Sequence, residues 1–166
     1  MSPSAAERSP FRVVRETEEA TTVFCGHCAE VPAENDDEGA SRVCAKCGMG
    51  LLLQAPAKSA PTVNDPFLVV DGTLAICAVS KQAEKLLGIS ETEAVNRHVA
   101  EFIVPGDSEA PTRENLAALL TWAARGETPN QDVVVRPANT FGVRYWARVS
   151  PCGPPTAALL ILADAR

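Results

Sequence analysis

The sequence has no long apolar run and very little histidine. None of its hydrophobic segments approaches the ~20 residues that a transmembrane helix requires, and the first ten residues, MSPSAAERSP, lack the basic start and apolar stretch of a secretory signal. We therefore expect a cytoplasmic protein without a membrane partner. With two histidines in the chain, the usual general bases are scarce. No nucleophile–base pair, phosphate loop or carboxylate pair stands out, so we expect no catalytic residues and no enzyme activity.

The sequence also lacks a basic excess. Its formal net charge is −6, and acidic residues outnumber basic ones both before and after Thr62. Proteins that bind phosphate backbones normally present clustered Lys and Arg. A nucleic-acid partner is therefore not expected.

Composition divides the chain into four parts. Residues 1–10 are rich in Ser, Pro and Ala and are expected to form a disordered tail. Residues 11–53 hold four of the six cysteines, residues 54–65 have the composition of a semi-extended linker, and residues 66–166 are rich in apolar side chains. We predict a small N-terminal domain and a larger C-terminal domain, uncoupled by the linker.

The clearest motif is a pair of C-x-x-C turns, Cys25–Cys28 and Cys44–Cys47. A two-residue gap lets a tight turn aim both thiolates at one metal, and four thiolates form the closed tetrahedral shell of structural zinc. We predict one structural zinc ion per chain, held by Cys25, Cys28, Cys44 and Cys47. Disulfides are disfavoured in the cytoplasm, and a redox C-x-x-C normally stands alone. His27 could replace one cysteine, but we interpret it as a solvent-side residue of its turn.

Residues 20–53 resemble the zinc ribbons, in which two such turns close a small β-structure. The polar segment Ala33–Ser41 is interpreted as a solvated loop between two strands. So short a stretch cannot build its own core, so the metal must supply the folding free energy, on the order of 10–16 kcal/mol for such sites.

Three helices in the C-terminal domain are predicted from their capping residues. Ser80, Ser90 and Thr112 can each cap a helix N-terminus. Gly88 and Gly126 can end the first and third helices in the left-handed conformation. The apolar face of the third helix would be formed by Leu116, Leu119 and Leu120.

Five strands are predicted in the same domain. Asp71-Gly72 favours a hairpin turn between the first two, and the fourth alternates apolar and polar residues from Phe141 onward, with Phe141 facing inward. The last is almost wholly apolar and should lie in the middle of the sheet. The result is an α+β fold with one antiparallel sheet. The strands cover Pro66–Val70, Thr73–Val79, Gln131–Arg136, Phe141–Val149 and Thr156–Ala163.

From Pro66 to Ile103 the sequence resembles a PAS domain. PAS sequences share a β-hairpin, a small helix reading A-x-x-L-L-G, then S-x-x-E and a G-R-like step. The later helix and strands continue the same order through residue 164. Ser80 stands where PAS domains often have Asn, and Asn96 stands where Gly is common. Because of these differences, the ligand of any particular PAS domain is not assumed for this chain. The matching residues are Ala83, Leu86, Leu87, Gly88, Ser90, Glu93 and Arg97.

The resemblance implies a sensory or interaction module with a pocket between sheet and helices. Light-sensing flavin PAS domains carry a reactive Cys in N-C-R-F-L, whereas the segment here, Asn96–Ala100, has no thiol. Haem PAS domains often place a ligating His on the long helix, which has none here; His98 precedes it. We therefore expect no haem or flavin, and only a small apolar ligand stays open. The pocket is expected to be lined by Leu74, Ile76, Leu86, Leu87, Phe102, Leu119 and Val134.

The resemblance also implies a homodimer, because PAS domains often pair through the outer sheet face. The fourth strand would present Trp146 outward between Arg144 and Arg148, an aromatic anchor of the kind found at interfaces.

We interpret the protein as a non-enzymatic sensory or regulatory module whose zinc ribbon is a second docking surface for a protein partner of unknown identity. Two alternatives stay open. One is a transcription regulator whose ribbon contacts DNA or the transcription machinery, and the other is a redox sensor that loses zinc when its thiolates oxidise.

Overall fold

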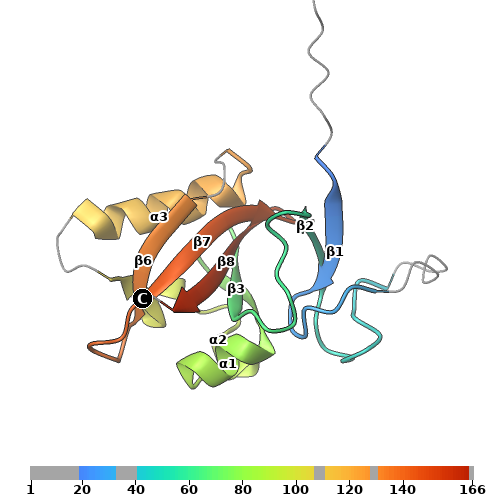
Figure 1. Ribbon diagram of the computed structural model, residues 1–166, viewed down its shortest axis with the longest axis horizontal. Helices are drawn as coiled ribbons and strands as arrows, with labels where there is room; N and C mark the ends of the chain where they lie inside the picture. Colours follow the sequence, from blue (N-terminus) through green and yellow to red (C-terminus); the bar gives the residue numbers. More distant parts are fainter. Residues whose placement is uncertain (1–18, 33–40, 107–110, 128–130, 165–166) are drawn as a thin grey trace, which may run out of the picture.

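The computed structural model describes residues 19–32, 41–106, 111–127 and 131–164, and the structural statements below concern these residues. The expected tail, residues 1–10, and all but the last residue of the expected loop at 33–41 lie outside them. Strands β1 (Thr21–Cys25) and β2 (Leu52–Pro56) pair in a two-stranded antiparallel sheet. With the two cysteine turns, they form what we call the four-cysteine unit (Figure 1).

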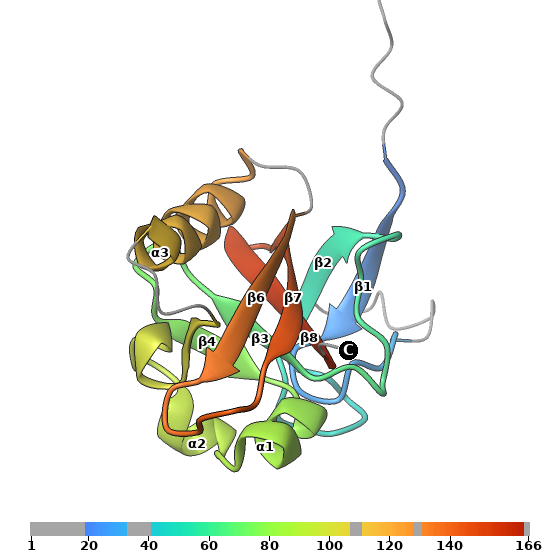
Figure 2. The same cartoon turned by 60° about the vertical axis from the view of Figure 1, so that its left-hand side comes forward.

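A six-stranded antiparallel sheet makes up most of the remaining chain, with strand order β4-β3-β8-β7-β6-β5. The helices α1 (Lys81–Leu87), α2 (Glu91–Ala94) and α3 (Pro111–Ala124), with the 3-10 turn η1 (Val99–Glu101), lie on one side of this sheet, and β1 and β2 lie on the other (Figure 2). No helix in the described ranges is long and apolar enough to cross a membrane. The strands are β3 (Phe67–Val70), β4 (Ile76–Val79), β5 (Ile103–Pro105), β6 (Gln131–Pro137), β7 (Tyr145–Cys152) and β8 (Ala157–Asp164).

The predicted helix ends are confirmed where local chemistry sets them. The Ser80 side chain accepts a hydrogen bond from the Ala83 amide, and Gly88 ends α1 with φ 65°. Ser90 caps α2 in the same way, and Gly126 follows α3 with φ 73°. The third helix begins at Pro111, because proline is favoured in the first turn, so Thr112 lies inside the helix and is not the cap that the sequence predicted.

Three strand predictions need correction. The strand expected over Thr73–Val79 begins only at Ile76, because the Asp71 carboxylate accepts from the amides of Thr73 and Ala75 and folds a longer turn. The strand expected to begin at Phe141 begins at Tyr145 and runs on to Cys152. Phe141 itself is 84% exposed, with the Arg136 guanidinium over its ring. The sheet also gains β5, whose three residues are too short for a pattern to reveal.

The inner core lies between the helices and the sheet, as the α+β fold class predicts. From Tyr145 to Val149, β7 alternates buried and exposed residues, as its pattern predicted. Strand β8 lies between β3 and β7, inside the sheet, as its apolar sequence predicted. The predicted face of α3 is buried against these strands by Leu116, Leu119 and Leu120.

A second core lies on the opposite face of the sheet and joins it to the four-cysteine unit. The Phe24 ring of β1 meets the Phe67 ring of β3 edge-on, with 5.8 Å between centroids. The proposed linker does not uncouple the two parts, because its first residues belong to β2 and the Gln54 backbone pairs with Gly153. This outer core contains Phe24, Ala29, Leu53 and Ala55 of the unit, with Phe67, Val69, Ala78, Cys152, Ala157, Leu159 and Ile161 of the sheet.

This shared core predicts a single cooperative unfolding transition. Replacing the fully buried Phe24 by Ala should remove about 3–5 kcal/mol from the free energy of unfolding of the whole chain, the usual cost of such a cavity. Chemical denaturation followed by circular dichroism and by tryptophan fluorescence measures this loss. Phe141→Ala, at an exposed site, is the matched control and should change little. Two separate transitions, with the tryptophan signal unaffected by Phe24→Ala, would contradict the shared core.

Candidate metal centre and its junction with the sheet

The two cysteine turns have the same backbone shape. The residue after each second cysteine adopts the left-handed conformation, Ala29 with φ 61° and Gly48 with φ 68°. In each turn this residue donates its amide to the carbonyl of the first cysteine, at 3.0 Å to Cys25 and 2.9 Å to Cys44. Each turn therefore aims its two thiols to the same side.

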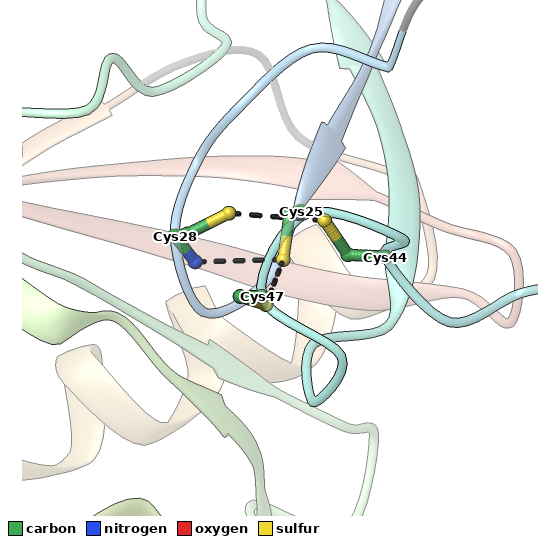
Figure 3. Close-up of side chains that lie close together, drawn as sticks. All are labelled: Cys25, Cys28, Cys44 and Cys47. Carbon is green, nitrogen blue, oxygen red and sulfur yellow. Dashed lines mark hydrogen bonds between the residues drawn. The ribbon is translucent and has the colours of Figure 1, made fainter.

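The four thiols converge on one point between the turns (Figure 3). Their sulfur atoms all lie within 4.8 Å of one another, with 3.6 Å from Cys25 to Cys47 and 3.8 Å from Cys28 to Cys44. A tetrahedron with zinc–sulfur bonds of about 2.3 Å has edges of about 3.8 Å. A disulfide would need about 2.05 Å, and all four cysteines are free. The sulfur positions thus fit the edges of a tetrahedral metal shell.

Backbone amides surround these sulfurs. The amides of His27 and Cys28 point to Cys25 Sγ at 3.3 and 3.4 Å, and the Gly50 amide points to Cys47 Sγ at 3.4 Å. Burial raises the pKa of the Cys25 and Cys28 thiols. Burial acts in the same direction on Cys47, but hydrogen bonds from backbone amides and from the Cys25 and Cys28 side chains together outweigh it and lower the pKa of this thiol to about 6. A bound cation would favour the thiolate at all four positions.

Gly50 leaves the space that the sulfurs occupy. A Cβ atom on Gly50 would lie 2.1 Å from Cys25 Sγ and 2.9 Å from the His27 backbone nitrogen. Such distances are impossible without moving the first turn. Glycine is therefore required at this position, because a Cβ atom there would overlap Cys25 Sγ, and the C-x-x-C spacing alone does not predict it.

His27 is not the solvent-side residue that the sequence suggested. It is 5% exposed, and its Nδ1 lies 3.0 Å from the Val79 carbonyl oxygen and 3.3 Å from Glu91 Oε2. Its own carbonyl accepts the Lys81 amide at 2.8 Å. Because both partners of Nδ1 are acceptors, this nitrogen carries the proton and is not a metal ligand. The sequence pattern does not predict this contact, since Glu91 lies 64 residues after His27 in the chain.

A pocket of about 260 Å³ lies between α3 and the η1–β5 segment. Its wall is mainly apolar, with His98 as a polar member whose Nδ1 accepts the Ala100 amide at 3.1 Å. Of the seven residues proposed for a pocket, Leu74 lines this one. Lining residues include Leu74, His98, Ile103, Leu116, Ala117 and Leu120.

The other six residues proposed for the pocket lie elsewhere. Val134 is opposite Trp146 in the β6–β7 register, so it lies on the outer face of the sheet. Leu86 is exposed on α1. Ile76 and Leu119 are buried in the inner core, while Leu87 and Phe102 pack at its border.

The residues proposed for an interface lie where the outer face is uncovered. Trp146 is 47% exposed. Arg148 lies on the same face of β7, and its Nε lies 3.9 Å from Oδ1 of Asp132 on β6. Arg144 is exposed just before β7 begins. Because the four-cysteine unit covers β3, β4 and β8, the uncovered part is an open strip formed by Asp132, Val134, Trp146 and Arg148.

Comparison with known proteins identifies the larger part of the chain. A family model described as PAS fold matches residues 59–151. Among solved structures, the PAS domain of the quorum-sensing receptor RpfR from Cronobacter turicensis, in complex with BDSF, is 12% identical with a TM-score of 0.48, over 62% of this chain and 95% of that one. The PAS domain of nitrogen regulation protein NR(II) from Vibrio parahaemolyticus is 21% identical with a TM-score of 0.43, over 61% and 89%.

A third solved relative is the PAS domain of an HTR-like protein from Haloarcula marismortui. It is 17% identical with a TM-score of 0.45, over 61% of this chain and 81% of that one. No curated protein gives a significant match. Because the family model covers more than half of the sequence, the chain belongs to the PAS fold family.

Proposed function

We propose that this chain is a non-enzymatic sensory or regulatory module in which a PAS domain carries one structural zinc ion. The observation that supports it most directly is the convergence of four thiols, at tetrahedral spacing, in a unit that shares its core with the PAS sheet. Zinc is the metal that four thiolates suit best. It would be held by Cys25, Cys28, Cys44 and Cys47, and a closed sulfur shell leaves no position for a catalytic water.

The role of the zinc follows from the small size of the unit. Two strands alone are marginally stable, yet β1 and β2 must hold Phe24 and Leu53 against the sheet. A metal that joins the two turns would fasten the end of β1 to the start of β2, where Cys25 pairs with Leu52. Zinc would therefore stabilise the outer core and, through it, the PAS domain.

Zinc content tests the proposal. We expect one zinc ion per chain by elemental analysis and native mass spectrometry. Removing it with a chelator should lower the unfolding temperature of the whole protein, because the outer core loses its clamp. A protein that is purified without metal, and that neither binds added zinc nor gains stability from it, would contradict the proposal.

Two glycine substitutions test whether the metal is held by the four cysteines. Gly50→Ala should abolish zinc binding, because the new methyl group would occupy the place of Cys25 Sγ. Gly72→Ala is the matched control, since a Cβ there meets nothing within 4 Å. Titration with Co²⁺, whose thiolate complexes absorb visible light, compares the variants. Equal cobalt binding by Gly50→Ala and wild type would show that the metal is held elsewhere.

We further infer that the PAS pocket holds neither haem nor flavin, and that any ligand it accepts would be small and apolar. Its volume of about 260 Å³ is below the ~300–1,000 Å³ typical of ligand pockets. Because the His98 Nδ1 accepts the Ala100 amide, the neutral ring carries its proton on Nε2, and neither ring nitrogen has a free lone pair for iron.

An absorption spectrum tests this inference about the pocket. Protein purified from its own host should be colourless above the aromatic band. A Soret peak or a flavin spectrum at near-stoichiometric level would refute the inference and make His98 the first residue to replace.

We propose a second copy of the chain as the partner of the open strip. Trp146 offers a large aromatic anchor. Arg148 and Asp132 give the strip both charge signs. In a two-fold dimer, Arg148 of one copy can face Asp132 of the other, so the strip is complementary to itself.

Sedimentation analysis tests the dimer. Trp146→Ala should weaken it by at least about 30-fold, the effect of losing an interface anchor worth ~2 kcal/mol or more. Trp122→Ala is the matched control, because Trp122 is 48% exposed but lies on α3, on the other side of the sheet. A wild-type monomer at high concentration, or equal weakening by both variants, would refute the proposed interface.

A further inference from the structure

The buried imidazole of His27 joins the metal turn to the PAS domain. Its Nδ1–H points to two acceptors, the Val79 carbonyl at the end of β4 and the Glu91 carboxylate at the start of α2. The side chain is almost completely buried, so water does not compete for these contacts. Breaking them would leave a buried polar group unpaired, which is unfavourable away from water.

Glu91 is held in place from several directions. Its Oε2 accepts the Val79 amide at 2.9 Å in addition to facing His27. Its own backbone amide donates to Glu84 Oε1 of α1 at 2.7 Å. Glu91 is therefore held by β4 through its carboxylate and by α1 through its backbone amide.

On its other side, His27 contacts the metal ligands through its backbone. It lies between Cys25 and Cys28, and its amide points to Cys25 Sγ at 3.3 Å. The neighbouring Gly26 packs so closely on the sheet that a Cβ would lie 3.1 Å from Ala78 Cβ. Moving the His27 ring would therefore shift the backbone that aims the first two thiols.

We propose that Glu91 of the PAS domain is a positioning residue for the four-cysteine metal centre, acting through the buried ring of His27. The inference rests on the proposed zinc site and adds to it a specific route from α2 to the metal. Groups outside the ligand shell commonly fix ligand orientation in this way. Because coupling between two sites is reciprocal, zinc binding would in turn hold Glu91 and the β4–α2 junction.

The experiment measures the rate at which zinc leaves the loaded full-length protein for an excess of chelator. Glu91→Gln, which removes the charge with little change in shape, should raise this rate by about 10-fold, and Glu91→Ala by more. Glu93→Gln is the matched control, since Glu93 is exposed on the same helix. It should leave the rate unchanged.

A double-mutant cycle separates positioning from a general loss of stability. His27→Leu should speed release, whereas His27→Asn, whose amide can replace the Nδ1–H, should restore much of the wild-type rate. In the His27→Leu background, Glu91→Ala should add no further acceleration, although it still removes the acceptor of the Val79 amide. An additive effect would show that Glu91 acts on stability alone and would overturn the proposal.

Hydrogen exchange provides the reciprocal readout. Removing zinc should increase exchange across β4–α2, and this increase should vanish in His27→Leu. A release rate raised by less than about threefold in both Glu91 variants, far below the ~10–100-fold usual for such partners, would refute the positioning role. A wild-type protein that binds no zinc would refute the proposed zinc site itself, so the two failures are distinguishable.

Discussion

The contact between Phe24 and Phe67 is the constraint on which the arrangement depends. A sheet covered by helices on one face commonly leaves its other face to water and alternates apolar with polar residues. Strand β8 does not alternate, because Ala158, Leu160 and Leu162 enter the inner core while Ala157, Leu159 and Ile161 enter the outer one. Such a strand needs cover on both faces. The four-cysteine unit provides the second cover, and the Phe24 ring is its main apolar element.

The sequence could predict what short-range chemistry decides. Ser80 and Gly88 delimit α1 because each acts on backbone groups within a few residues, and C-x-x-C spacing brings thiols together in the same local way. It could not predict that His27 reaches Glu91, since only the folded sheet brings these residues together. Phe141 was misplaced because an apolar residue in a loop extends an alternating pattern without belonging to its strand. The PAS order and the fully apolar β8 were readable, but what covers the outer face of β8 was not.

Covering the outer face also limits how the domain can meet partners. The unit covers β3, β4, β8 and the end of β7, so within the described residues the uncovered part of this face is the strip around Trp146 between β6 and β7. Single-sided cover of this kind places the metal centre and the strip on the same face of one sheet. A partner bound at the strip would contact β7, and a metal in the unit would stabilise the cover over β8. These two strands pair directly, so both would bear on the same sheet.

The two cysteine turns differ in what holds them, and this difference indicates what a bound metal would add. The first turn is fixed to the sheet by the His27 contacts and by the close packing of Gly26 on Ala78. The second turn is held by backbone bonds to the residues before β2, and by Arg42, which donates to the Pro154 carbonyl oxygen. Its residues Ala45, Lys46 and Met49 are exposed, so little apolar burial holds it. A metal ion shared by all four thiols would attach the weakly held turn to the one that the PAS domain already fixes.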